Sequence, residues 1–377
     1  MTQFQVRALL DGAAAGRRLS AEEALFLYEQ GTLLELGQAA DRIRRQRWPG
    51  NVATFVVDRN INYANACEAD CSFCAFYRKP GHPEAYRLPI EEGVRRVGEL
   101  IEQGGTQVLF QGGLDTTIPF SYYEELCRAV KAAHPGAHLH SFSAPEIETM
   151  SKATGMGYEE ILIRLRAAGL DSVPGGGAEI LVDRVRDAVS PKKTTAQTWI
   201  AVHRAIHAVG MRSTATMTYG LGETAAERIE HLIKIRQLQD ERGGFTAFIP
   251  WSFQRGHTVL TLPPPGGMEY LRVIAISRLV LDNVPSIQAG WVTEGPKLAQ
   301  VALSFGANDF GGILIDEVVV GATGVVYRVD RAEALRLIRG AGRLPAQRNT
   351  KYEILKVYEQ ADDNAACRDL RADPAPA

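Results

Sequence analysis

The chain has 377 residues, of which 45% are hydrophobic and 23% are charged, a composition that argues against wholesale disorder and fits one large α/β domain or two ordinary ones. Its 42 Lys and Arg residues nearly balance 44 Asp and Glu residues, so the sequence shows no basic excess for nucleic acid or an anionic membrane. No apolar run is long enough to span a bilayer, and five cysteines are too few for a disulfide framework. We therefore expect a protein of the reducing cytoplasm, without membrane insertion.

Residues 1–50 carry helical patterns. Ser20 is a typical N-cap because Glu23 follows three positions later, and Gly31 is a typical stop. The segment "ELGQAADRIRRQRW" continues the helical spacing. We expect residues 1–50 to form an N-terminal helical extension outside the main fold.

After Asn51, short apolar runs alternate with amphipathic stretches. Seven of the gaps between the runs hold a helical pattern, and this alternation is typical of a parallel sheet. Eight units favour an α/β fold of the (β/α)8 TIM-barrel type over two halves of a doubly wound sheet. The expected strands are 53–62, 106–113, 137–143, 169–177, 211–220, 245–251, 285–291 and 306–314. We assign the barrel to residues 51–330, and a C-terminal helical cap with a disordered tail to residues 331–377.

In such barrels the active site lies at the C-terminal ends of the strands. Residues that directly follow each apolar run are therefore candidates for the site. They are residues 65–77, 111–113, 143, 175–179, 219–223, 250–254, 288–291 and 309.

Three of the five cysteines lie in the first of these segments. Cys67, Cys71 and Cys74 have the spacing C-x3-C-x2-C. Thiolates bind iron–sulfur clusters, zinc or copper, and a structural zinc ion needs four closed ligands. Cys127 lies within a helical pattern and Cys367 lies in the tail, so three ligands on one loop favour a [4Fe–4S] cluster with one open iron. A structural metal in a non-enzymatic barrel scaffold is the alternative.

The cysteine spacing, followed by the aromatic run "AFY", resembles the radical S-adenosylmethionine (SAM) superfamily. From about residue 51 to residue 355 the chain also resembles the menaquinone-forming radical enzymes of the futalosine pathway. The segments that carry this resemblance are "HSFSAPEI", "AGLDSVPGGGAEIL", "SPKK" and "FIPWSFQ". The resemblance implies that Cys67, Cys71 and Cys74 hold a [4Fe–4S] cluster whose open iron binds SAM. It also implies an electron donor such as flavodoxin or ferredoxin.

Within the pathway, the resemblance implies a cyclase that removes the C4′ hydrogen of dehypoxanthine futalosine and closes the carbon radical onto the benzoate ring. The sibling family, the aminofutalosine synthases, joins the radical to an enolpyruvyl ether instead. "SPKK" and the tryptophan of "FIPWSFQ" favour the cyclase. One departure is "DEVVV" at 316–320, where we expect an acidic pair followed by Asn and find Val318.

The resemblance implies that six residues bind the cofactor, and each has a structural alternative. Glycines let a backbone approach a ligand but also end strands, Ser143 is also a typical N-cap, and Glu179 also suits the first turn of a helix. The tyrosine can equally pack at the base of the loop, and the lysine can equally belong to a solvated pair with Lys192. The six are Tyr77, Gly112, Gly113, Ser143, Glu179 and Lys193.

The sequence assigns no catalytic residue, and the candidates are Trp251 and Glu179. Trp251 can stack on the benzoate ring, or it can pack at the barrel mouth. His203 and His207 form an H-x3-H pair, but a zinc site would need a Glu after the first His and a third ligand. We expect these two histidines to lie on a solvated helix face.

Overall fold

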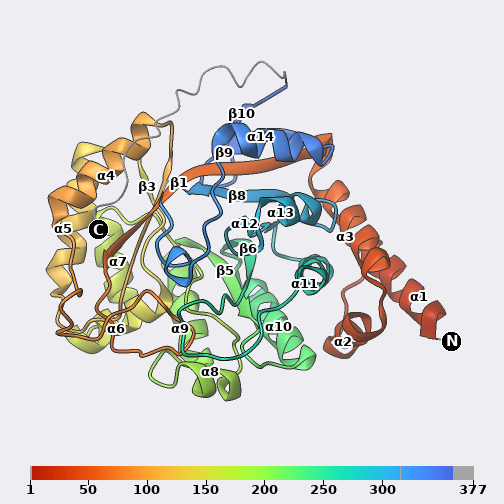
Figure 1. The fold of residues 1–377 in the computed structure, drawn as a ribbon, viewed down its shortest axis with the longest axis horizontal. Coiled ribbons are helices and arrows are strands. Elements are labelled where there is room, and N and C mark those ends of the chain that lie inside the picture. Colours follow the sequence, from red (N-terminus) through yellow and green to blue (C-terminus); the bar gives the residue numbers. More distant parts are fainter. Residues whose placement is uncertain (1, 315, 360–377) are drawn as a thin grey trace.

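The computed structural model describes residues 2–314 and 316–359, and it contains an eight-stranded parallel barrel surrounded by helices (Figure 1). Two sheets, β1–β2–β3 and β4–β5–β6–β7, meet through isolated bridges at His140–Ser172 and Gln288–Asp309. Strand β8 pairs with β1 and closes the ring. The predicted barrel is confirmed. Its strands are β1 (Val52–Ala64), β2 (Gln107–Gly112), β3 (His138–Leu139), β4 (Ser172–Val173), β5 (Arg212–Tyr219), β6 (Phe245–Ser252), β7 (Ser286–Ile287) and β8 (Asp309–Leu314).

Helices cover the outside of the barrel because each has one apolar face. In α4 the buried residues Gly93, Val97 and Leu100 recur at helical spacing and face the barrel. The helices that follow β1 to β8 are α4 (Ile90–Glu102), α5 (Phe120–Ala133), α6 (Ala144–Thr154), α7 (Tyr158–Ala168), α8 (Asp183–Val189), α9 (Ala196–Ala208), α10 (Ala225–Arg242), α11 (Gly267–Val280), α12 (Trp291–Glu294), α13 (Pro296–Ala302) and α14 (Arg331–Gly340).

The N-terminal residues form three helices outside the barrel, α1 (Thr2–Ala14), α2 (Ala21–Gln30) and α3 (Leu33–Arg47). Ser20 and Glu23 form the predicted capping box, and Gly31 ends α2. α3 packs against α11, and α2 packs against α10 and α11. The division of the chain at residues 50 and 330 stays a prediction.

The segment after residue 330 is not entirely helical, which corrects the predicted C-terminal cap. After α14 come β9 (Leu344–Arg348) and β10 (Ile354–Val357). β9 pairs with the beginning of β1, from Val52 to Phe55, because β2 joins β1 only from Asp58 onward. The first residues of β1 therefore have a free edge that β9 fills. The predicted disordered tail and Cys367 lie outside the described residues.

The connection between β9 and β10 closes the N-terminal end of the barrel. The Arg348 guanidinium bonds both Asp309 carboxylate oxygens, at 2.5 and 2.9 Å, and its carbon lies 3.8 Å from the centre of the Tyr352 ring. Arg348 and Asp309 are both buried, so this pair forms a polar floor beneath the barrel interior.

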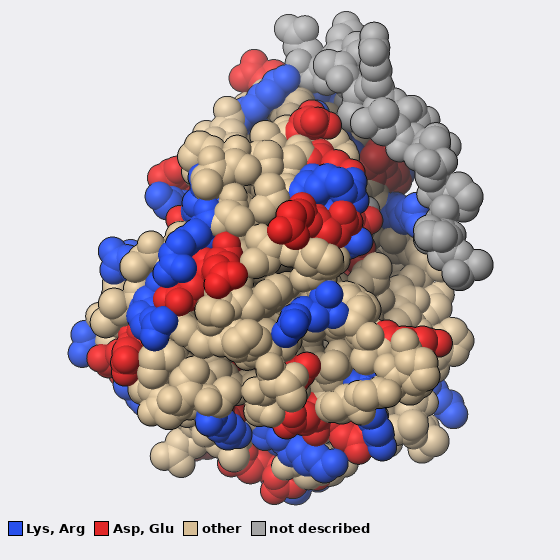
Figure 2. Space-filling view, turned by 90° about the vertical axis from the view of Figure 1, so that its left-hand side faces the viewer, with Lys and Arg blue, Asp and Glu red and all other residues tan. Residues whose placement is uncertain are grey.

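The surface shown in Figure 2 carries acidic and basic side chains side by side, without a broad region of one sign. Several charged side chains of the protein form ion pairs along a helix, as do Arg95 and Glu92 in α4 at 2.7 Å. In the part of the chain that the structure describes, none of the helices has the length and apolar character needed to cross a membrane.

Candidate active site at the barrel mouth

The barrel encloses a cavity of about 340 Å³ that opens at the C-terminal ends of the strands. Phe73 and Cys74 line its mouth, and Arg348 and Tyr352 line its floor. Several positions predicted from the strand ends lie on its wall. They are Gln111, Gly176, Gly177, Trp251, Ser252, Phe253, Gln254, Gln288, Ala289, Gly290 and Trp291.

The loop that carries the three cysteines follows β1 and is fixed by backbone hydrogen bonds. The Cys67 N–H donates to the Arg78 carbonyl at 2.9 Å, and the Ser72 N–H donates to the Val189 carbonyl at 2.9 Å. The Leu260 N–H donates to the Ser72 carbonyl at 3.0 Å. The loop is therefore held between the end of α8 and the long loop after β6, at the mouth of the cavity.

All three cysteines of this loop are free thiols. Cys71 is buried, whereas Cys67 and Cys74 are partly exposed. Burial raises the pKa of the Cys71 thiol to about 12, while the Lys193 ammonium favours the thiolate. A metal that binds here would replace the proton and remove the cost of burying a free thiolate.

The residues that the structure describes contain no group of three or more Cys, His, Asp or Glu side chains arranged around one metal ion. In a [4Fe–4S] cluster each thiolate binds a different iron, so the three sulfurs lie farther apart than the ligands of a single ion. Three thiols on one loop fit such a cluster.

Only glycine fits at positions 112 and 113, at the end of β2, because a Cβ atom at either position would clash with its neighbours. A Cβ atom on Gly113 would lie 1.9 Å from the Ala66 carbonyl oxygen and 3.1 Å from the Cβ atom of Cys67. A Cβ atom on Gly112 would lie 2.4 Å from the Tyr63 ring. The two glycines therefore allow the cysteine loop to pack directly on β2.

Glu146 is a site-forming residue that the sequence analysis missed. Its buried carboxylate accepts hydrogen bonds from the Tyr63 hydroxyl at 2.6 Å, the Gly112 N–H at 3.0 Å and the Ser143 hydroxyl at 2.5 Å. Ser143 is the N-cap of α6, which is the structural role that the sequence predicted as an alternative to cofactor binding. The spacing of Ser143 and Glu146 is that of a capping box, and this signal could have identified Glu146.

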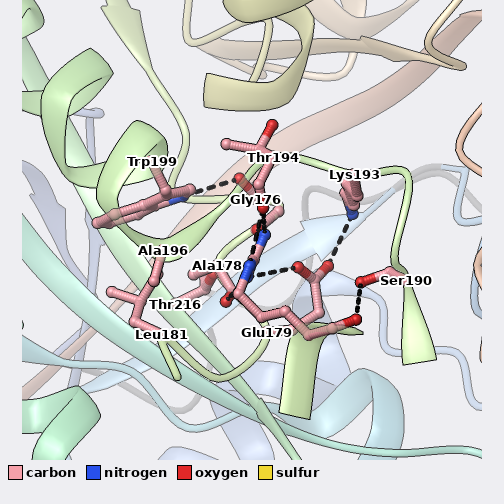
Figure 3. Close-up of polar contacts among 12 residues, drawn as sticks. Gly176, Ala178, Glu179, Leu181, Ser190, Lys193, Thr194, Ala196, Trp199 and Thr216 are labelled. Carbon is pink, nitrogen blue, oxygen red and sulfur yellow. Dashed lines mark hydrogen bonds and ion pairs between the residues drawn. The ribbon is translucent and has the colours of Figure 1, made fainter. Parts of the chain in front are cut away.

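Glu179 and Lys193 lie together at the end of the glycine-rich segment, where Figure 3 shows the two side chains facing each other. The Lys193 ammonium lies 2.8 Å from one carboxylate oxygen of Glu179, and the Arg186 guanidinium lies 3.4 Å from the other. Burial opposes ionisation of Glu179, but the two cations outweigh it and hold its pKa below the usual value. The result is a buried carboxylate that stays charged.

The backbone of Glu179 is in the left-handed region, with φ of +40°, which is uncommon for a residue other than glycine. Its carbonyl accepts a hydrogen bond from the Thr218 N–H at 3.0 Å. The Arg186 guanidinium also donates to the Ala178 carbonyl at 2.5 Å. Strained backbone held by its surroundings clusters at functional sites, so the geometry favours a functional role for Glu179.

Tyr77 lies in the cysteine loop, where its hydroxyl donates to the Asp70 carboxylate at 2.5 Å. This bond raises the pKa of Tyr77 to about 12. The second lysine of "SPKK", Lys192, is exposed and lies 3.5 Å from the same carboxylate. The structure thus separates the two lysines: Lys193 is partly buried against Glu179, and Lys192 lies at the surface.

Trp251 is the penultimate residue of β6 and lines the cavity. A Cβ atom on Gly290 would lie in ordinary contact with the indole, 3.5 Å from an atom of its ring, so Gly290 lies beside Trp251. Thr214, Thr216 and Thr218, on the neighbouring strand β5, face the same space. A large aromatic surface beside small polar groups suits a ligand with an aromatic ring.

His203 and His207 are buried, so the prediction of a solvated helix face was wrong. Both rings lie within hydrogen-bonding distance of the Ser213 hydroxyl, at 3.1 and 2.8 Å. The His203 ring also packs on Trp199, with 3.9 Å between ring centres. These histidines join α9 to β5, and desolvation lowers the pKa of both.

Two protein-family descriptions match the chain, the radical SAM superfamily over residues 61–235 and the CofH/MqnC C-terminal region over residues 242–361. The chain is 44% identical to a cyclic dehypoxanthine futalosine synthase of Halalkalibacterium halodurans, over 97% of this chain and 99% of that protein. It is 37% identical to an aminodeoxyfutalosine synthase of Streptomyces coelicolor, over 94% and 95% of the two chains. The crystal structure of methylornithine synthase has the same fold, with a TM-score of 0.72 at 20% identity over 90% of this chain and 97% of that chain.

Proposed function

Because the chain belongs to the radical SAM superfamily, in the family with the CofH/MqnC C-terminal region, we propose that it cyclises dehypoxanthine futalosine in menaquinone biosynthesis. The observation that carries this proposal is the near-full-length likeness to a cyclic dehypoxanthine futalosine synthase, which exceeds the likeness to an aminodeoxyfutalosine synthase. Trp251 in the cavity wall supports the same substrate, because the benzoate ring must be held for radical attack.

The cofactors of this superfamily are a [4Fe–4S] cluster and SAM, and we assign the cluster to Cys67, Cys71 and Cys74. When bound, the reduced cluster supplies the electron that cleaves SAM to a 5′-deoxyadenosyl radical, so the hard chemistry belongs to the cofactors. The protein supplies a buried loop for the thiolates and a cavity wall beside it for the substrate.

The ion pair of Glu179 and Lys193 lies where the protein would contact both cofactors. The Lys193 ammonium lies close enough to Cys71 to favour its thiolate, and close enough to Glu179 to keep that carboxylate charged. A charged carboxylate at this position can accept hydrogen bonds from the ribose hydroxyls or the amine of SAM. We therefore assign Glu179 and Lys193 to cofactor binding, with Gly113 and Ser143 shaping the same region.

The walls of the cavity perform the remaining tasks. Trp251 covers one face of the substrate ring, and it fills space that a second substrate would need. Phe73, Phe253 and Trp291 line the same cavity and exclude water from the radicals. Abstraction of the C4′ hydrogen then leaves a carbon radical that closes onto the neighbouring benzoate ring. Loss of one electron to a one-electron acceptor, and of one proton, then restores the aromatic ring and gives a product with two hydrogen atoms fewer than the substrate.

We also propose a reducing cytoplasm as the compartment, and a small redox protein such as flavodoxin or ferredoxin as the electron donor. The four cysteines among the described residues are all free thiols, which suits a reducing compartment. Thiolate ligands of a cluster need the same condition.

The test is to incubate the anaerobically reconstituted, reduced protein with SAM and each candidate substrate. With dehypoxanthine futalosine we expect 5′-deoxyadenosine in a one-to-one ratio to a cyclic product. Consumption of the enolpyruvyl ether substrate with release of bicarbonate would instead assign the protein to the aminofutalosine synthases.

A further inference from the structure

A carboxyl group that none of the assignments above uses lies on the cavity wall. Asp316 and Glu317 follow β8, and the pairing of Leu314 with Asp58 brings this segment beside Asn60 on β1. Asp58, Asn60 and Glu317 all line the cavity. Because residues two apart on a strand share a face, Asp58 and Asn60 present their side chains to the same interior.

The two consecutive acids have different partners. Asp316 accepts a hydrogen bond from the Arg59 Nε–H at 2.7 Å, and both residues line a separate surface hollow. Glu317 lines the cavity instead, and in the part of the chain that the structure describes no Lys, Arg or His lies within ion-pair distance of it. The sequence alone does not distinguish the two, since both belong to the same acidic pair.

The two oxygens of Glu317 have unequal partners. One oxygen accepts hydrogen bonds from the Val319 and Val320 N–H groups, both at 2.9 Å, and so anchors the loop. The other accepts only from the Asn60 amide, at a long 3.3 Å. Burial raises the pKa of the Glu317 carboxyl, although the hydrogen bonds from Val319, Val320 and Asn60 oppose this effect. A carboxylate oxygen can accept about two hydrogen bonds, so this oxygen has room for another donor.

The same wall has a surplus of acceptors. The side-chain oxygen of Asn60 and one carboxylate oxygen of Asp58 are buried without a hydrogen-bond partner among the described groups. Buried polar atoms are nearly always paired, so this wall is suited to a ligand that brings hydrogen-bond donors. It is unsuited to an anionic group, because Asp58 and Glu317 in their ionised forms would repel it.

We propose that Glu317 binds the substrate by accepting a hydrogen bond from a hydroxyl group of its sugar ring. This inference rests on the proposed function and extends it to the orientation of the substrate. The sugar hydroxyls lie against the wall formed by β1 and the loop after β8, and the benzoate ring lies against Trp251 on β6. The anionic carboxylate of the benzoate is then turned away from the two acids.

The departure at Val318 fits this arrangement. Val318 is 46% exposed and lines the surface hollow beside Asp316 rather than the cavity. The valine therefore leaves the contact between Glu317 and the cavity unchanged.

The test measures binding without turnover, with the reconstituted protein and SAM but no reductant. The probes are dehypoxanthine futalosine and analogues that each lack one sugar hydroxyl. Glu317→Gln keeps an oxygen for the Val319 and Val320 N–H groups and replaces the cavity-facing oxygen with a donor. We expect it to weaken binding of dehypoxanthine futalosine by about 10- to 100-fold, as for the loss of a hydrogen bond to a charged group. The matched control, Asp316→Asn, should bind within about threefold of the wild-type protein.

The analogues distinguish a direct contact from a general disturbance of the loop. For one analogue, which lacks the hydroxyl that Glu317 contacts, the wild-type protein and Glu317→Gln should bind equally well. An equal loss of affinity for every analogue, or no loss for the full substrate, would overturn the inference while leaving the proposed function intact. Failure of the wild-type protein to bind dehypoxanthine futalosine would overturn both.

Discussion

The Lys193 ammonium lies 2.8 Å from the Glu179 carboxylate, where Glu179 is buried and Lys193 is partly buried beside the cysteine loop. This pair joins the glycine-rich segment after β4 to the connection between α8 and α9. Lys193 is also 5.7 Å from the centre of the Phe73 ring, which belongs to the cysteine loop. One ammonium group thus contacts the carboxylate and an aromatic ring of the loop that carries the thiols.

We expect Lys193→Met to lower the free energy of unfolding by about 1–3 kcal/mol, because among the described residues it leaves Glu179 with Arg186 as its one ion-pair partner. Urea denaturation of the cluster-free protein measures this effect. Lys193 helps to depress the pKa of Glu179 in the folded protein. The stabilisation from this ion pair is therefore present above the pKa of Glu179 in the unfolded protein, and it is lost as the pH falls through the pKa of Glu179 in the folded protein. The difference between the two proteins should therefore shrink in acid.

Lys192→Met is the matched control for that variant. The Lys192 side chain is 64% exposed, and its contact with Asp70 is 3.5 Å long. We expect a change in the free energy of unfolding of less than about 0.5 kcal/mol. Equal effects of the two substitutions would contradict a special role for the buried pair.

Gly113→Ala should prevent correct formation of the cysteine loop. The added methyl group would overlap the Ala66 carbonyl and displace the backbone next to Cys67. We expect the wild-type protein to take up about four irons per chain on anaerobic reconstitution, and the variant to take up far less. Gly136→Ala is the control, because a Cβ atom there would meet nothing within 4 Å. Full iron uptake by Gly113→Ala would show that the close approach is unimportant.

Trp251→Ala should separate cleavage of SAM from formation of product. Trp251 makes none of the hydrogen bonds described above for the cysteine loop, so 5′-deoxyadenosine should still form. A ring that is held loosely lets the substrate radical be quenched before it closes, and we expect the ratio of product to 5′-deoxyadenosine to fall about tenfold or more. Trp48 lies outside the cavity, near Tyr352, and Trp48→Ala should keep the wild-type ratio. An unchanged ratio in Trp251→Ala would mean that this residue only packs at the mouth.

Asp58→Asn should change the pH dependence of stability. Burial raises the pKa of Asp58 to about 7, although Arg348 favours its charged form. Because the pKa of Asp58 is higher in the folded than in the unfolded protein, its contribution to the free energy of unfolding is fully present below the unfolded pKa of about 3.9. This contribution is lost as the pH rises from there through 7, by up to about 1.4 kcal/mol per pH unit. Relative to wild type, the variant should therefore gain stability between pH 4 and 7. Parallel curves from denaturation at several pH values would contradict this assignment.

The barrel could be predicted because its signal is repeated. Eight apolar runs and the helical patterns between them each give a weak indication, and together they specify one architecture. β9 could not be predicted, because "LPAQR" contains Pro345 and has no clear alternation of apolar residues. It forms a strand because β1 begins at Val52, whereas β2 pairs with β1 only from Asp58 onward. The sequence does not show this offset between the two strands.

The candidate site was predictable to a similar degree. Clustered cysteines and strand-end glycines are visible as spacing, and the loop geometry explains why they occur together. The pairing of Tyr63 with Glu146 is not visible, since the two residues are 83 positions apart and meet only through packing of α6 on the barrel. The burial of His203 was missed for the same reason, because a histidine pair on a helix has the same spacing whether the face is buried or solvated.

The most direct test of the proposed function uses dehypoxanthine futalosine that carries deuterium at C4′. With the reduced, reconstituted protein and SAM, we expect one deuterium in each 5′-deoxyadenosine and none in the product. The product made from unlabelled substrate should be lighter than that substrate by two hydrogen atoms. Deoxyadenosine without deuterium, or a product that keeps the label, would contradict abstraction at C4′ and with it the assignment as a cyclase.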